Sequence, residues 1–183
     1  AYLTFKALKN GHLQLTQTLP VSTKAWKTEG SKMFIEPNMP VTVDELLHGT
    51  IVQSGNDSSI ALAEGVAGSE EVFAELMNKE AARLGMTHTH FVNSTGLPDT
   101  NHYTTAADLS LLASALVHDF PAEYQRFYAL KSYTYNKITQ PNRNRLLWLD
   151  PYVDGMKTGH TESAGFCLIS SAKRGDTRLI SVV

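Results

Sequence analysis

Apolar residues recur at helical spacing through most of the chain, and polar or glycine-containing segments separate the groups. Residues 1–8 read as a helix that ends at Asn10-Gly11, and a loop follows from Leu19 to Pro40. A capping box, Thr42-Val-Asp-Glu45, opens the next helix. Three further helices are expected: one over about 57–67, one between the cap Ser69 and Gly85, and one from Leu109 to His118, before Pro121.

The pattern changes after residue 130. Residues 132–136 alternate with period two, and residues 164–171 and 177–183 are apolar and partly β-branched. Arg174-Gly-Asp176 lies between the last two runs and predicts a hairpin turn. A helical block over 41–130 therefore precedes a sheet block over 131–183, whose last two strands the hairpin would join.

Composition excludes several classes of function. The 183 residues carry 16 basic and 18 acidic side chains, a net charge of −2 that gives no reason to expect nucleic acid as a partner. A single cysteine, Cys167, excludes an internal disulfide and a multi-thiolate metal site, and we expect it to be buried on its strand. His88 and His90 have a ligand-like spacing but no third ligand nearby, so neither a metal nor another cofactor is predicted.

Two short polar motifs stand out against this background. Ser54-Gly-Asn56 joins two predicted helices, where short polar side chains can project into a cleft. Lys157-Thr-Gly159 precedes a predicted strand, and Gly155, Gly159 and Gly165 would leave its edge bare for a substrate backbone. Taken alone, each motif is more often an ordinary turn or strand edge than part of an active site.

Their order and context resemble the serine penicillin-binding proteins and β-lactamases, whose signatures are Ser-x-x-Lys, Ser-x-Asn and Lys-Thr-Gly. Longer stretches are similar to the low-molecular-mass D-alanyl-D-alanine carboxypeptidases: Gln53-Ser-Gly-Asn-Asp-Ser-Ser-Ile-Ala-Leu-Ala-Glu64, Gln140-Pro-Asn-Arg-Asn-Arg-Leu-Leu-Trp148 and Val153-Asp-Gly-Met-Lys-Thr-Gly-His-Thr161. The resemblance implies a β-lactamase/transpeptidase-like α/β fold, with an antiparallel sheet flanked by helices and a mostly helical subdomain. Residues 1–183 would form part of one penicillin-recognising catalytic domain, with 1–40 as the end of the nucleophile helix and a loop.

The chemistry that the resemblance implies is hydrolysis of a D-Ala-D-Ala peptide bond through a serine acyl-enzyme. Ser54 would relay a proton to the leaving nitrogen, Asn56 would hold the active-site lysine and the substrate amide, and Lys157 would favour the anionic transition state. The implied substrate-binding residues recognise the peptide backbone and its terminal carboxylate: Thr158, Gly159, His160 (through its backbone N–H), Thr161 and Arg143.

The sequence departs from the family pattern in one respect. Its one literal Ser-x-x-Lys, Ser170-Ser-Ala-Lys173, falls on a predicted strand, where positions i and i+3 face opposite sides. We therefore expect the nucleophilic serine and its lysine to lie upstream of Ala1, so that this segment alone lacks the nucleophile.

Several alternatives remain open at this stage. Arg143 and Arg145 could instead be solvated or paired with Asp150 or Asp154, and Ser31 and Lys32 could border the cleft or belong to an ordinary surface loop. A β-lactamase of the same fold would need a deacylating glutamate, for which Glu75 has the wrong spacing. A non-catalytic ligand-binding relative is the third reading.

The resemblance also implies partners and a location. The partners would be peptidoglycan stem peptides ending in D-Ala-D-Ala and β-lactam antibiotics. The full-length protein would work in the periplasm or otherwise outside the cytoplasm, associated with the inner membrane only through a C-terminal anchor that is not among these residues.

Overall fold

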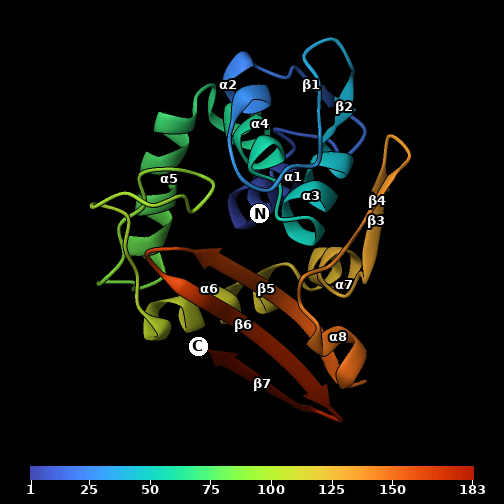
Figure 1. Cartoon of the computed structure of the whole chain (residues 1–183). Coiled ribbons are helices and arrows are strands. Elements are labelled where there is room, and N and C mark those ends of the chain that lie inside the picture. The colour runs from blue at the N-terminus through green and yellow to red at the C-terminus, as the bar shows by residue number, and fades with distance from the viewer.

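A computed structural model describes all residues from 1 to 183 and shows a helical layer above a small sheet (Figure 1). The elements in chain order are α1 (Tyr2–Lys9), β1 (Thr18–Leu19), α2 (Thr23–Lys27), β2 (Val41–Thr42), α3 (Val43–Val52), α4 (Asn56–Ala67), α5 (Glu70–Arg83), α6 (Ala106–Asp119), α7 (Pro121–Tyr128), β3 (Ser132–Tyr135), β4 (Ile138–Pro141), α8 (Leu146–Leu149), β5 (Val153–Thr161), β6 (Gly165–Arg174) and β7 (Thr177–Val182).

Polar caps explain where the helices begin. The Thr42 hydroxyl accepts the Glu45 N–H at 3.2 Å, and the Glu45 carboxylate accepts the Thr42 N–H at 2.8 Å, so the predicted capping box is present at the start of α3. Ser69 caps α5 and Thr105 caps α6 in the same manner. The predicted helices and the strand at residues 132–135 are confirmed.

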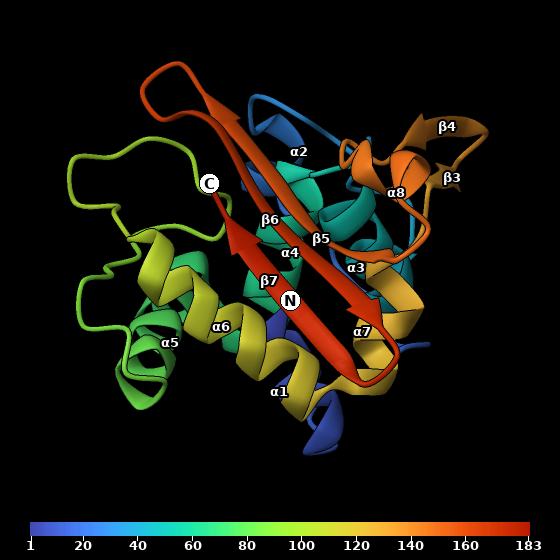
Figure 2. The ribbon, with the colours of Figure 1, turned by 90° about the horizontal axis from the view of Figure 1, so that it is seen from below.

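The main sheet is antiparallel, with strand order β5-β6-β7, and two short two-stranded ladders, β1-β2 and β3-β4, lie outside it. Gly175 takes a φ of 57° in the turn between β6 and β7, as the predicted hairpin requires. Helices α6 and α7 lie along one side of the sheet (Figure 2). The order leaves β5 as an edge strand, and its position beside the helical layer is what places the candidate site.

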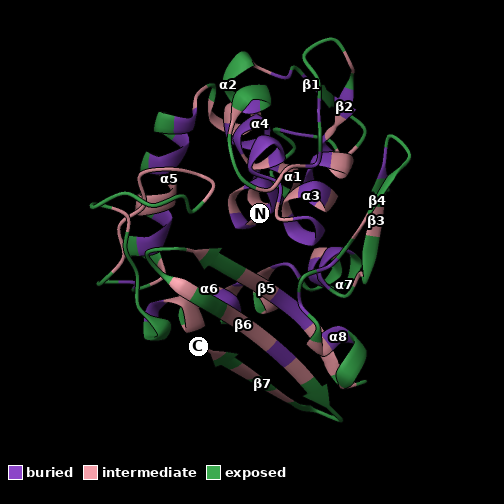
Figure 3. Ribbon diagram, viewed as in Figure 1, coloured by how far each residue is buried: buried purple, intermediate pink, exposed green.

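One hydrophobic cluster joins the helices to the sheet. Phe5 on α1 is fully buried and packs between Phe120 and Phe127, with ring centroids 5.7 and 5.8 Å away. The same cluster includes Met156 of β5. Burial is concentrated in α1, α3 and α4, whereas β7 is at most half-buried (Figure 3). Packing, rather than any single polar contact, therefore sets how β5 faces the helices.

The structure corrects two expectations about the sheet. Cys167 is exposed rather than buried, because it lies near the β5-β6 hairpin, beyond the part of the sheet that α6 and α7 cover. Gly155 does not leave the strand edge open to a ligand, because the Tyr124 side chain fills the space that a Cβ atom there would occupy. Gly159 is open, because the nearest atom to a Cβ at that position would be Cys167 Cβ at 3.9 Å.

Other elements were absent from the sequence-based expectations. Helix α6 ends at Asp119, before Pro121 as predicted, but a further helix, α7, begins at Pro121, where the missing N–H has no consequence. The short helix α2 lies in the segment expected to be a loop, and β4 and α8 are elements of the sheet block that had not been predicted individually. No helix of the structure has the length and apolar character needed to cross a membrane.

Candidate active site

The two polar motifs meet across the gap between the helical layer and the sheet. Lys157 Nζ on β5 donates to Ser54 Oγ at 2.7 Å and to the Thr158 carbonyl at 2.7 Å. An ammonium group has three donors, so one remains for a ligand. The predicted proximity of Ser54 and Lys157 is confirmed, while their chemical roles remain predictions.

The connection between α3 and α4 fixes the direction of Ser54. Ser54 has a φ of 58°, in the left-handed region that is uncommon for a residue with a side chain. The Gly55 N–H donates to the Gly49 carbonyl at 3.0 Å, and the Gly55 carbonyl accepts hydroxyls from Ser58 and Ser59 at 2.9 and 2.8 Å. These bonds hold a turn that presents the Ser54 hydroxyl to β5.

The free edge of β5 offers backbone groups to a ligand. Leu168 exchanges both of its backbone hydrogen bonds with Val183, on the far side of β6. Backbone groups alternate in direction along a strand, so those of Cys167 and Ile169, on either side of Leu168, point toward β5. There Cys167 pairs with Gly159 and Ile169 pairs with Lys157. The N–H and C=O groups of Thr158 and His160 then point to the open edge, as an oxyanion donor at His160 would require.

Burial and a neighbouring cation perturb Lys157. Burial, together with the smaller effect of the positive charge on Arg143, lowers the pKa of the Lys157 ammonium to about 8. Arg143 itself is exposed and forms no ion pair. Asp150 pairs with Arg174 and Asp154 with Arg178, so the alternative that either carboxylate neutralises Arg143 is wrong. The site therefore holds two cations without an acidic partner.

Two of the remaining predicted residues, Asn56 and Thr161, are hydrogen-bonded within the chain, whereas the third, Thr158, has a free hydroxyl. Asn56 Nδ2 donates to the Glu29 carbonyl at 2.7 Å and its N–H donates to the Ser31 carbonyl at 2.8 Å, so the residue is bound to the 29–31 segment. The Thr161 hydroxyl accepts the Ala164 N–H at 3.0 Å and helps to close the β5-β6 hairpin. The Thr158 hydroxyl makes no hydrogen bond within the chain, which leaves it free for a ligand.

The His160 ring lies at the rim of the site. It packs on the Phe166 ring with centroids 4.1 Å apart, and the Phe166 side chain is 88% exposed. His160 thus contributes its backbone to the open edge of β5 while its ring forms an exposed aromatic pair on the sheet.

Sequence reasoning missed the amide side chains that hold the segment carrying Arg143. Gln140 Nε2 donates to the Lys32 carbonyl at 3.0 Å, and Asn142 Nδ2 donates to the Leu130 carbonyl at 2.9 Å. The Asn144 N–H then donates to Asn142 Oδ1 at 2.9 Å. In the sequence, Gln140, Asn142 and Asn144 lie close to Arg143, and this spacing could have predicted that amide side chains hold the segment. The contact between Gln140 and the backbone of Lys32 also brings the 29–35 segment next to the Arg143 segment.

The literal Ser-x-x-Lys and the candidate glutamate lie apart from this arrangement. Ser170 and Lys173 are on β6, as expected, and three positions on a strand place them on opposite faces of the sheet. Glu75 is exposed on α5. None of the three hydrogen-bonds to Ser54 or Lys157.

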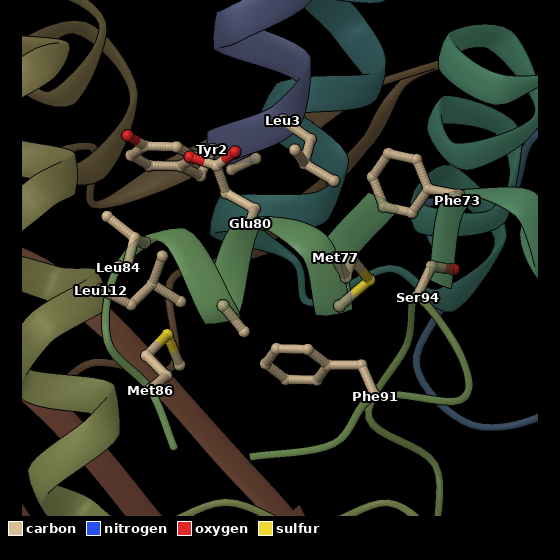
Figure 4. Close-up of a pocket in the computed structure, with 12 residues that line it drawn as sticks. Tyr2, Leu3, Phe73, Met77, Glu80, Leu84, Met86, Phe91, Ser94 and Leu112 are labelled. Atoms are coloured by element: carbon tan, nitrogen blue, oxygen red, sulfur yellow. The ribbon is translucent and has the colours of Figure 1, made fainter. Parts of the chain in front are cut away.

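A separate apolar pocket of about 130 Å³ lies between α1, α5 and the segment 86–94 (Figure 4). Phe73, Met77 and Phe91 line it, and its Glu80 carboxylate is already bound by Lys6 and Arg83. Neither Ser54 nor Lys157 lines this pocket, so it is not the candidate active site.

Comparisons with known proteins give a consistent result. The family described as D-alanyl-D-alanine carboxypeptidase matches residues 1–183. D-alanyl-D-alanine carboxypeptidase DacC of Escherichia coli K12 is 48% identical over 190 residues, which cover 100% of this chain and 47% of that protein. The chain therefore spans about half the length of the curated relatives it matches.

Solved structures with similar folds agree. Penicillin binding protein 5 from Haemophilus influenzae has a TM-score of 0.95 and 43% identity, and the match covers 100% of this chain and 54% of that one. Penicillin-Binding Protein D2 from Listeria monocytogenes, solved in its ampicillin-bound form, has a TM-score of 0.88 and 30% identity, with 100% and 74% coverage. The predicted α/β fold is confirmed by these matches.

Proposed function

Since this chain belongs to the D-alanyl-D-alanine carboxypeptidase family, we propose that it forms part of the catalytic domain of a serine-type carboxypeptidase. The enzyme removes the terminal D-alanine from peptidoglycan stem peptides through a serine acyl-enzyme. Residues 1–40, 41–130 and 131–183 supply the end of the nucleophile helix with its loop, the helical subdomain and the sheet portion of that single domain.

The observation that carries this proposal is the 2.7 Å contact between Lys157 Nζ and Ser54 Oγ at the open edge of β5. A hydroxyl beside a partly desolvated ammonium can pass a proton to a leaving amine, while the positive charge favours an anionic tetrahedral intermediate. The substrate backbone lies along β5, where the His160 N–H supplies one oxyanion donor.

Recognition of a free carboxyl terminus follows from the same charges. Arg143 and Lys157 have no acidic partner, and guanidinium and ammonium groups both bind carboxylates through charge-assisted hydrogen bonds. The Thr158 hydroxyl adds an uncharged donor beside them. The arrangement therefore suits a substrate with a free carboxylate next to the scissile bond, as in a peptide that ends in D-Ala-D-Ala.

The same site accounts for antibiotics as ligands. Ampicillin is bound in the structure of the Listeria relative. We propose that β-lactams acylate the enzyme containing this chain at the same nucleophile, and that the enzyme acts outside the cytoplasm, on the periplasmic side of the inner membrane, to which a C-terminal anchor tethers it.

The direct test uses the full-length enzyme. Purified protein is incubated with a peptide ending in D-Ala-D-Ala, and released D-alanine is quantified, with labelled penicillin and intact-mass measurement in parallel. We expect D-alanine release and one penicillin adduct per molecule. Penicillin binding without D-alanine release would refute the carboxypeptidase assignment, and the absence of both would refute the proposed function as a whole.

The 183-residue segment by itself should form no stoichiometric adduct with penicillin, because none of its serines stands beside a lysine in a helical Ser-x-x-Lys arrangement. Intact mass after incubation with labelled penicillin measures this. An adduct on any serine from Ser22 to Ser181 would show that the nucleophile lies within the segment.

The pH dependence of the full-length enzyme should report on Lys157. If the ammonium form is required, kcat/KM falls as pH rises through about 8, where Lys157 loses its proton. Arg143→Ala removes the smaller cause of the lowered Lys157 pKa. The fall of kcat/KM should therefore move to higher pH, although burial still keeps the Lys157 pKa below that of an ordinary lysine. Arg145→Ala, an exposed arginine two positions away, is the control and should leave the fall in place. An unchanged fall in Arg143→Ala would contradict the coupling.

A further inference from the structure

A buried carboxylate lies directly behind the Ser54-Gly55-Asn56 turn. Asp57 is 1% exposed and sits in the first turn of α4. Its Oδ1 accepts the N–H groups of Met33 at 2.9 Å and Ser58 at 2.8 Å, and its Oδ2 accepts those of Phe34 at 2.8 Å and Ile35 at 3.2 Å. Four backbone amides thus converge on a single side chain.

The environment of Asp57 is unusual for a buried charge. No lysine, arginine or histidine forms an ion pair with it, so backbone dipoles and the N-terminus of α4 are what stabilise a carboxylate there. The bonds leave little freedom in the segment they bind, since Phe34 is held at a φ of 70°, a conformation rare for a residue with a side chain.

The segment held by Asp57 is also held by the turn next to Ser54. The Asn56 N–H and Nδ2 groups bind the carbonyls of Ser31 and Glu29. Gly55 has no room for a Cβ atom, which would lie 2.8 Å from Asp57 Oδ1 and 3.1 Å from the Met33 nitrogen. Residues 29–35 and the Ser54 turn are therefore packed as one unit around the carboxylate.

We infer that Asp57 is a positioning residue for the reaction: its carboxylate locks the 29–35 segment to the Ser54 turn, and so holds Ser54 Oγ at its distance from Lys157 and fixes the cleft wall beside Asn56. The inference rests on the proposed function for its kinetic readout. Asp57 itself touches neither Ser54 Oγ nor Lys157 Nζ, so its effect is indirect. Displacement of a reacting group by about 1 Å typically costs roughly 10²-fold in rate.

The test compares two buried carboxylates of the same kind in the full-length enzyme. Asp57→Asn keeps the volume but faces an NH₂ group toward two of the four amide donors. Asp108→Asn is the control, because Asp108 is also buried in the first turn of a helix and binds the His88 N–H at 2.8 Å and the Thr89 hydroxyl at 2.6 Å. Asp57→Ala extends the series if it folds. The readouts are the penicillin acylation rate, D-alanine release, Tm and amide hydrogen exchange.

Asp57→Asn is expected to lower acylation roughly 10²-fold. It should also speed exchange at the amides of Met33, Phe34 and Ile35 by about tenfold or more. Both variants should lower Tm by similar amounts, but Asp108→Asn should keep acylation near the wild-type rate. Near-wild-type acylation by Asp57→Asn, or an equal loss in Asp108→Asn, would overturn the inference. If the wild-type enzyme neither acylates nor releases D-alanine, the proposed function fails, whereas the exchange measurement still tests whether Asp57 fixes residues 33–35.

Discussion

Replacing Ser54 with alanine in the full-length enzyme should lower the rates of penicillin acylation and D-alanine release by about 10²–10⁴-fold, the usual range for loss of a proton-transfer group. The hydroxyl accepts from Lys157 Nζ at 2.7 Å and faces the open edge of β5, so its removal breaks the only side-chain link between the two motifs. Single-turnover kinetics with labelled penicillin measure the acylation step directly. Circular dichroism and Tm establish whether the variant remains folded.

Two further variants separate the hydroxyl from the backbone. Ser54 has a φ of 58°, so Ser54→Gly removes the hydroxyl while relieving the conformational cost of a side chain there. It should be as inactive as Ser54→Ala; recovery in the glycine variant would trace the defect to backbone strain. Ser170→Ala tests the serine of the literal Ser-x-x-Lys on β6 and should have no effect. Near-wild-type turnover by Ser54→Ala would reduce Ser54 to a turn residue.

Lys157→Ala should lower kcat/KM for peptides ending in D-Ala-D-Ala by roughly 10²–10³-fold, as is typical when one donor to a developing oxyanion is lost. The partly buried ammonium acts where water is scarce, so its charge stabilises an anion better than it would in bulk solvent. Steady-state kinetics on the folded variant give kcat and KM separately. A change confined to KM would indicate a role in ground-state binding alone.

Lys157→Arg should not restore full activity. The ammonium makes 2.7 Å contacts with Ser54 Oγ and the Thr158 carbonyl, and the larger planar guanidinium directs its donors differently. Lys173→Ala, at the exposed end of β6, is the matched control and should be silent. Free replacement of Lys157 by arginine would show that only a diffuse positive charge is needed.

The parts of this fold that the sequence predicts are those determined by local chemistry. Thr42 with Glu45, Ser69 and Thr105 mark helix starts because their side chains bind nearby backbone N–H groups, a relation contained within a few residues. The β6-β7 hairpin follows from Gly175 for the same reason. The fold as a whole and the roles of Ser54 and Lys157 rested on resemblance to a family.

Features that depend on tertiary surroundings were not predictable. Cys167 has the composition of a buried strand residue, yet its exposure depends on how far α6 and α7 extend along the sheet. Arg143 lies near Asp150 and Asp154 in sequence, but these carboxylates form ion pairs with Arg174 and Arg178 instead. Asp57 follows a recognised motif, and only the path of residues 33–35 shows what its carboxylate binds.

The hydrogen bond between Ser54 and Lys157 joins residues 103 positions apart. Closing a flexible loop of that length costs roughly 4 kcal/mol or more in chain entropy. One hydrogen bond to a charged group returns only about 1.5–3 kcal/mol. The contact therefore forms because packing around Phe5, Phe127 and Met156 has already brought the two halves together. Since the scaffold does not depend on the pair, either side chain can be exchanged without undoing the architecture, and this independence leaves the chemistry of the cleft open to change by point mutation during evolution.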